Sequence, residues 1–299
     1  MRKPNFIIAG FPKCGTTSLY HYLSEHPQIF LPNQKELHFF THKNISKLNQ
    51  GPKDKIVKQT QIKTSCEYLS FYKSVKKEIA IGDASPSYIN YPSEFPKIKD
   101  YLGDPKVIII LRDPINRSFS NYLHLKREYR EHLSFFEAIR CEEERKKSMY
   151  SDFWYYKFNS TYYQKILKAK EIFSNVLVLT LEELNETPNK SMKKVYNFLG
   201  VDENFKLKSL SNKFNVGGSF KQNFFTKLIF QPSGFKNKIK KIIKPSPFIK
   251  SILMKISTLF ASDKENIDEQ SINNLKEYFR KDVHMLKSIN VDVSKWRKY

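Results

Sequence analysis

A short segment near the amino terminus combines the residue types that hold a phosphate. Residues 10–18 read Gly-Phe-Pro-Lys-Cys-Gly-Thr-Thr-Ser. The apolar run before them, residues 6–9, is typical of a short buried strand, and the leucines and tyrosines after them are typical of a helix. A glycine-bounded turn between a strand and a helix N-terminus directs backbone N–H groups and the positive end of the helix dipole at one point. The segment therefore predicts an anion-binding loop.

The residue order in this loop differs from that of a nucleotide P-loop. Gly10 and Gly15 have the spacing of the two P-loop glycines. Thr16 and Thr17 stand where Lys-Ser/Thr is expected, and Lys13 precedes the second glycine instead. We therefore expect a phosphate loop that serves something other than ordinary Mg-ATP chemistry. The alternative is a glycine turn before an ordinary helix, with Lys13 in solvent.

A second segment places an arginine at the end of an apolar run. The run Lys106–Leu111 predicts a buried strand that delivers Arg112 at its carboxyl end. Pro114 then ends the strand, and the helix that follows carries Ser120. The planar fork of arginine suits a phosphate, and a serine hydroxyl can donate one further hydrogen bond. The alternative pairs Arg112 with Asp113 or uses it to cap a helix.

The two segments together resemble the nucleotide-binding motifs of the sulfotransferase family. Residues 12–19 match its 5′-phosphosulfate loop, Pro-Lys-x-Gly-Thr-Thr/Ser-x-Leu, and residues 106–122 match its 3′-phosphate motif, strand–Arg-Asp-Pro-x-x-Arg-x-x-Ser-x-Tyr. Residues 35–40 resemble the Lys-Glu-x-His-Phe-Phe loop of heparan-sulfate-type and bacterial carbohydrate sulfotransferases. Residues 82–88 resemble their Gly-Glu-x-Ser-Pro-x-Tyr segment, although Asp83 replaces the glutamate, and Ala84 stands where some relatives carry a lysine.

This resemblance implies transfer of a sulfuryl group from 3′-phosphoadenylyl sulfate (PAPS) to a hydroxyl of a carbohydrate or glycan. Lys13 is expected to stabilise the leaving phosphate, and Glu36 to act as the general base, with His38 as its rival. The residues expected to bind the donor are Lys13, Cys14, Gly15, Thr16, Thr17, Ser18, Arg112 and Ser120. A sulfuryl group carries less charge than a γ-phosphoryl group, and the sequence has no clear cluster of metal ligands, so no metal is expected.

The order of predicted elements indicates the fold class. Strands are expected at residues 6–9, 78–82, 106–111 and 176–181. They alternate with helical patterns, among them residues 138–147, 160–173 and 271–289, and a helix that begins at Pro188 and ends at Gly200. Alternation of this kind predicts an α/β fold in three layers around a central parallel sheet, the P-loop NTPase-like fold of sulfotransferases. Ligands of such sheets bind at the carboxyl ends of the strands.

Length and composition favour one domain over residues 1–299. Its portion from about residue 222 onward is expected to be basic and mostly helical, and residues 43–77 are expected to form a surface excursion. Residues 222–262 alternate lysines with apolar residues, which fits either a basic helix on a membrane or a plain helix over the core. The three cysteines are widely separated, the chain enters a strand almost at once, and it has no long apolar run. These features favour a cytoplasmic protein, with peripheral contact at the inner face of the membrane as a further expectation.

The charge balance narrows the partners. The chain has 52 Lys and Arg against 30 Asp and Glu, a net charge of +22, which attracts nucleotides, acidic glycans, anionic lipid surfaces or nucleic acids. A nucleic-acid-binding protein and a P-loop kinase remain alternatives. Because no helix-turn-helix, zinc-finger or RNA-recognition signature is present, nucleic acid is not the expected partner. The expected partner is a glycan or glycolipid-type acceptor.

Overall fold

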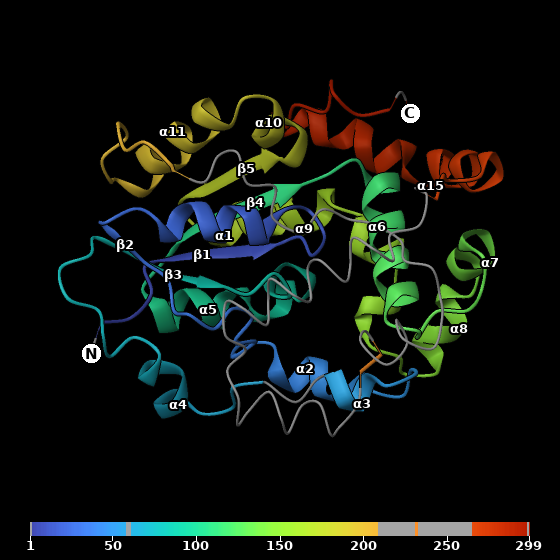
Figure 1. Cartoon of the computed structure of the whole chain (residues 1–299), viewed down its shortest axis with the longest axis horizontal. Helices are drawn as coiled ribbons and strands as arrows, with labels where there is room; N and C mark the ends of the chain where they lie inside the picture. The colour runs from blue at the N-terminus through green and yellow to red at the C-terminus, as the bar shows by residue number, and fades with distance from the viewer. Residues whose placement is uncertain (1, 58–60, 209–230, 233–264, 298) are drawn as a thin grey trace.

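A five-stranded, all-parallel sheet forms the centre of the computed structural model, which describes residues 2–57, 61–208, 231–232, 265–297 and 299 (Figure 1). The strand order is β2-β3-β1-β4-β5. The strands are β1 (Phe6–Gly10), β2 (Ile29–Phe30), β3 (Ala80–Ala84), β4 (Lys106–Leu111) and β5 (Val176–Thr180). The predicted α/β class with a central parallel sheet is therefore confirmed.

Strand pairing brings three loops to one edge of the sheet. β1 lies between β3 and β4, with Phe6 opposite Gly82 on one side and Lys106 on the other. Since parallel strands end at the same edge, the segments after Gly10, Ala84 and Leu111 lie side by side. These are the loops that carry most of the predicted site.

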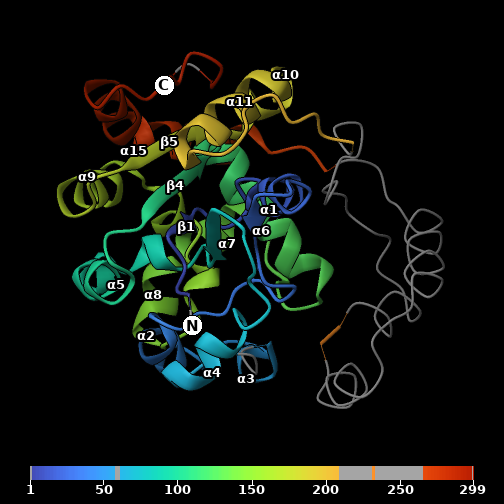
Figure 2. The same ribbon diagram turned by 90° about the vertical axis from the view of Figure 1, so that its left-hand side faces the viewer.

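Helices cover both faces of the sheet. Figure 2, which looks along the strands, shows α1 (Thr16–Ser24) on one face and α5 (Phe95–Leu102) and α9 (Tyr163–Ile172) on the other. α6 (Pro114–Arg127) follows β4 and extends beside the sheet (Figure 1). The remaining helices are α2 (His42–Lys47), α3 (Asp54–Val57), α4 (Ser65–Ser70), α7 (Phe135–Arg140), α8 (Glu142–Lys147), α10 (Leu181–Glu186), α11 (Pro188–Leu199) and α15 (Glu269–Ser288). Both faces are therefore covered, as continuous apolar strands require.

Helix boundaries differ from the sequence prediction in two places. The helix expected at residues 138–147 is two helices, since α7 ends at Arg140 and α8 begins at Glu142. The helix expected at residues 160–173 begins at Tyr163, because Ser160 ends a preceding 3-10 turn, and its hydroxyl meets that of Ser118 at 2.8 Å. The start and end of α11, with proline at its first turn and Gly200 in the left-handed region after it, are confirmed.

The segment 43–77 is less superficial than predicted. Ile62, Tyr68 and Tyr72 are buried, because their side chains pack into the core under β3. The Tyr68 hydroxyl donates to Asp83 of β3 at 2.9 Å, so a buried carboxylate draws the segment inward.

The C-terminal region is described in part. On α15, which matches the helix predicted at residues 271–289 within two residues, Leu275, Phe279, Val283 and Leu286 are buried and form an apolar stripe. Most of the basic segment 222–262 lies outside the described residues. No helix within the described ranges has both the length and the apolarity to cross a bilayer.

Candidate functional site

Two glycines shape the loop between β1 and α1. Gly15 has a φ of 92°, a left-handed conformation that favours glycine, and a Cβ there would lie 2.6 Å from Cδ1 of Leu181. A Cβ at Gly10 would lie 2.2 Å from Cγ2 of Ile89. The first bond of α1 runs from the Leu19 N–H to the Gly15 carbonyl at 3.1 Å, so the N–H groups before it have no partner within the helix. The loop thus has the backbone geometry that the predicted anion cradle requires, and anion binding there stays a prediction.

A buried arginine fastens this loop to α6. Arg117 Nε donates to the Pro12 carbonyl at 3.0 Å, and Nη2 donates to Asn121 Oδ1 at 2.6 Å. The side chain is fully buried, and no carboxylate of the described residues forms an ion pair with it. Burial lowers the pKa of Arg117. The arginine of the second motif therefore supports the loop of the first, a role that the sequence analysis did not assign to it.

Lys13 occupies a cationic and largely desolvated position. Its Nζ lies 3.5 Å from Nδ1 of His124, and no carboxylate of the described part lies within ion-pair distance of it. Burial, followed by the charges of Arg127, Arg117 and Arg112, lowers the pKa of Lys13 to about 8. An anion placed here would be attracted by the lysine and by all three arginines.

The other loop residues fall into two groups. Cys14 is buried, its N–H donates to the Phe11 carbonyl at 3.2 Å, and burial raises the pKa of its thiol to about 12. Its N–H is used inside the turn and its thiol packs in the core, and binding of the donor by Cys14 stays a prediction. Thr17 faces the adjacent loop, where its hydroxyl accepts a hydrogen bond from Lys35 Nζ at 2.7 Å. Thr16 is buried and Ser18 is half-buried.

The segment 35–40 brings a carboxylate and an imidazole beside the phosphate loop. The Glu36 N–H donates to the Ala84 carbonyl at 2.9 Å, which fixes the segment to the end of β3. The Glu36 side chain is half-exposed, with Lys35 Nζ at 3.7 Å and His38 Nε2 at 4.0 Å from its oxygens. His38 Nδ1 lies 2.8 Å from the Ser87 hydroxyl. The structure therefore brings Glu36 and His38 together near Lys35 and Thr17.

Asp83, in place of the glutamate of the resembled motif, is fully buried. Its carboxylate accepts hydrogen bonds from Ser85 at 2.6 Å, Tyr88 at 2.7 Å and Tyr68 at 2.9 Å. Burial raises its pKa in spite of these bonds. Asp83 thus holds the turn after β3 and does not reach the open site.

In the second motif, the Arg112 guanidinium has no polar partner among the described residues. No hydrogen bond or ion pair joins the Arg112 side chain to any residue that the structure describes, and the Arg112 carbonyl accepts from Tyr162 at 2.8 Å. Asp113 caps α6 by accepting from the Asn116 N–H, and it pairs with Arg297 at 3.2 Å. The alternative in which Arg112 pairs with Asp113 is therefore wrong. Ser120 lies half-buried on α6.

Comparison with known proteins shows which family the chain belongs to. The family model described as "Sulfotransferase domain" matches residues 3–227. The chain belongs to the sulfotransferase family. A crystal structure of a sulfotransferase from Alicyclobacillus acidocaldarius is 28% identical in sequence, with a TM-score of 0.77 over the whole of both chains.

Two curated relatives match only part of this sulfotransferase. One is the membrane-associated sulfotransferase kil1 of Dictyostelium discoideum, 37% identical over 119 residues, which are 40% of this chain and 22% of the relative. The other is carbohydrate sulfotransferase 15 of Mus musculus, 32% identical over 151 residues, which are 40% of this chain and 27% of the relative. The match spans about a quarter of the length of these relatives.

Three residues that lie beside Lys13, on and just after α6, were not predicted from the sequence: His124, Arg127 and Glu128. His124 stands four residues after Ser120, one helical turn further along α6. That spacing puts His124 on the same face of α6 as Ser120, which is a sequence signal that could have placed it near the nucleotide site. Among the described residues, no group of three or more His, Cys, Asp or Glu side chains could hold a metal ion.

Proposed function

We propose that this protein transfers a sulfuryl group from PAPS to a hydroxyl of a carbohydrate or glycan. One observation carries the proposal: two anion-binding features end neighbouring strands. The loop with Lys13 follows β1. The guanidinium of Arg112, which no described residue pairs with, follows β4, and β4 is hydrogen-bonded to β1. A nucleotide with phosphate groups at both its 5′ and 3′ positions would use both features at once, whereas a nucleoside triphosphate would use only the loop.

The loop residues would serve the leaving group. As the bond from sulfur to the 5′-phosphate oxygen breaks, negative charge grows on that oxygen, and a fixed cation stabilises it. Lys13 stands beside the start of α1, where the N–H groups of residues 15–18 would hold the phosphosulfate. Arg112 and Ser120 would bind the 3′-phosphate, which lies away from the reacting sulfur.

Glu36 is the proposed general base. Its carboxylate is half-exposed and can reach an acceptor hydroxyl, whereas the His38 ring is directed by its contact with Ser87. The 4.0 Å between Glu36 and His38 Nε2 allows the imidazole to orient the carboxylate. Glu36→Gln should abolish transfer while leaving donor binding intact. His38→Asn, with an amide Nδ2 or Oδ1 still available to Ser87, should retain part of the activity. The reverse ranking of the two variants would make His38 the base.

A glycan acceptor is supported by the curated relative called a carbohydrate sulfotransferase. Contact with an anionic membrane surface is supported by the net charge of +22 and by the relative called membrane-associated. Both proposals can be examined with one labelled donor, by screening soluble glycans against lipid-linked sugars in anionic and neutral vesicles.

The direct test of the donor is calorimetric titration with adenosine 3′,5′-bisphosphate in the absence of metal. We expect binding at tens of micromolar or tighter, and transfer of labelled sulfate from PAPS to a glycan in the screen. Absence of bisphosphate binding would reject the proposal. ATP binding that needs magnesium, and that the bisphosphate does not displace, would favour a P-loop kinase instead.

A further inference from the structure

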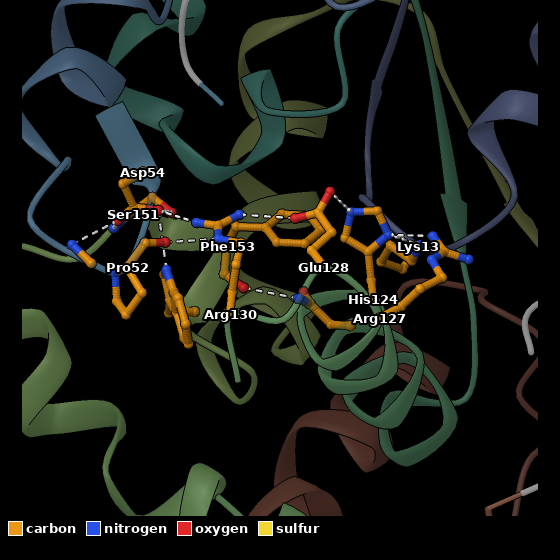
Figure 3. Close-up of polar contacts among 12 residues, drawn as sticks. Lys13, Pro52, Asp54, His124, Arg127, Glu128, Arg130, Ser151 and Phe153 are labelled. Carbon is orange, nitrogen blue, oxygen red and sulfur yellow. Dashed lines mark hydrogen bonds and ion pairs between the residues drawn. The ribbon is translucent and has the colours of Figure 1, made fainter. Parts of the chain in front are cut away.

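A line of polar contacts extends from Lys13 into the protein (Figure 3). Lys13 Nζ lies 3.5 Å from His124 Nδ1, and Arg127 Nη2 donates to the same nitrogen at 2.8 Å. On the other side of the ring, His124 Nε2 lies 3.4 Å from a Glu128 oxygen. The imidazole therefore stands between two cations and one carboxylate.

These partners select one form of the imidazole. Lysine and arginine can only donate hydrogen bonds, so Nδ1 must carry a lone pair, and the ring proton resides on Nε2, facing Glu128. Burial lowers the pKa of His124, in spite of the contact with Glu128. The ring is thus neutral near pH 7, with a fixed acceptor aimed at the phosphate loop.

The far end of the line is anchored in the core. Glu128 contacts Arg130 Nη1 at 3.2 Å, and Arg130 Nη2 bonds to Asp54. Asp54 is buried and also accepts from the Ser151 N–H at 2.7 Å and from Trp154 Nε1 at 3.1 Å. Burial opposes ionisation of Glu128, but the hydrogen bond from His124 and the charge and hydrogen bond of Arg130 outweigh it and lower its pKa to about 2. A carboxylate held on both sides in this way fixes the orientation of the ring.

Packing also restrains the His124 ring. It forms a T-shaped contact with the Phe153 ring, with the ring centroids 5.2 Å apart. Lys13, by contrast, has no acidic partner among the described residues, and it feels repulsion from Arg112, Arg117 and Arg127. Among the described residues, His124 Nδ1 is the one hydrogen-bond acceptor that lies beside the Lys13 ammonium group.

We propose that His124 is a positioning residue that holds the Lys13 ammonium group at the phosphate loop. A neutral acceptor is suited to this task, because it restrains the lysine without neutralising the charge that the leaving phosphate needs. Glu128 fixes the ring proton on Nε2, and Arg127 donates a hydrogen bond to Nδ1, the nitrogen that also faces Lys13. The inference rests on the proposed role of Lys13 toward the 5′-phosphate.

Two substitutions of His124 distinguish the role of Nδ1 from the role of Nε2. Asparagine carries its carbonyl oxygen on Cγ, as histidine carries Nδ1, so His124→Asn keeps an acceptor for Lys13. Glutamine carries its polar atoms one bond further, so His124→Gln keeps a partner for Glu128 and loses the acceptor at the Nδ1 position. His124→Ala loses both. All three variants lose the aromatic ring and its contact with Phe153.

Calorimetry with two nucleotides isolates the contribution of the 5′-phosphate to the binding affinity. The probes are adenosine 3′,5′-bisphosphate and adenosine 3′-phosphate, which lacks the 5′-phosphate. We expect His124→Ala and His124→Gln to weaken bisphosphate binding about tenfold, the scale of one charged hydrogen bond. His124→Asn should stay close to wild type, and all variants should bind the 3′-phosphate alike.

Equal weakening for both nucleotides, or an asparagine variant no better than the glutamine variant, would overturn the proposal. If the wild-type protein itself failed to bind the bisphosphate, the donor assignment would fall, and this inference with it. A second measurement needs no ligand: the ¹⁵N resonances of the His124 ring should show the proton on Nε2 near neutral pH. A proton on Nδ1 would refute the proposed hydrogen bond.

Discussion

Two arginines of one motif are expected to fail in opposite ways when each is replaced by methionine. Arg112 ends β4 with a guanidinium that no described residue binds, whereas Arg117 is fully buried and bonds to Pro12 and Asn121. Arg112→Met should therefore weaken nucleotide binding and leave stability unchanged. Arg117→Met should lower stability, because it strands buried acceptors.

The magnitudes follow from the contacts. A hydrogen-bonded charge pair contributes about 1.5–3 kcal/mol, so loss of Arg112 should weaken binding of a 3′-phosphate by roughly 10- to 100-fold. For Arg117, the Pro12 carbonyl and the Asn121 amide oxygen lose their donor. Each unsatisfied buried acceptor costs about 1–3 kcal/mol. The two together lower the melting temperature by roughly 3–10 °C in a chain of this size.

The assay compares adenosine 3′,5′-bisphosphate with adenosine 5′-phosphate in calorimetry and measures thermal unfolding of each variant. Arg112→Met should lose discrimination between the two nucleotides while it melts like wild type. If this variant bound the bisphosphate as tightly as wild type, the assignment of the 3′-phosphate site would be refuted. If Arg117→Met melted like wild type, the support that we assign to this arginine would be wrong.

Three further predictions concern the phosphate loop. Because the pKa of Lys13 is lowered to about 8, its positive charge is lost as the pH rises through 8, so bisphosphate affinity should fall by up to about tenfold per pH unit above that value. Lys13→Met should bind more weakly and show a flat profile by titration across the same pH range. Gly15→Ala should lower both stability and affinity, because its Cβ would meet Leu181 in a left-handed backbone; unchanged unfolding would show that the loop tolerates the methyl group. Cys14, buried and with its pKa raised to about 12, should resist iodoacetamide at mildly alkaline pH while exposed Cys66 reacts, as mass spectrometry of the modified peptides can show.

The sequence predicted the strands that carry the site, because β1 and β4 are continuous apolar runs bounded by turn residues. It missed β2, since two residues, Ile29 and Phe30, leave no periodicity to detect. Residue types also could not reveal which polar side chains are already paired. Arg112 and Arg117 look equivalent in the sequence, and only tertiary contacts separate the open guanidinium from the one that holds the loop.

Contacts between distant segments explain the other differences. Asp83 matches a motif position, yet its two tyrosine partners turn it into a buried anchor. His124 and Asp54 lie far apart in the sequence, and Arg130 links their neighbourhoods through contacts that no local pattern records. Local sequence patterns therefore predicted the motif residues, whereas the contacts that support these residues could not be predicted from such patterns.

The backbone itself sets the proposed reactive residues apart. Lys13, Glu36 and His38 all have positive φ values, in the left-handed region that favours glycine. A non-glycine residue in this region costs about 1 kcal/mol or more. Of the other described non-glycine residues with positive φ, Asp104, Tyr129, Met149 and Asn290 follow the ends of helices, where this conformation is ordinary, and Lys53 immediately precedes α3.

Lys13, Glu36 and His38 end no helix, so helix termination does not account for their conformation. Strain of this kind persists where surrounding contacts over-determine the backbone, and it concentrates at functional sites. Here the Glu36 N–H bond to Ala84 and the Arg117 bond to Pro12 are such contacts. The fold thus keeps a lysine, a carboxylate and an imidazole in strained backbone conformations, and the proposed sulfuryl transfer would give a reason for each orientation.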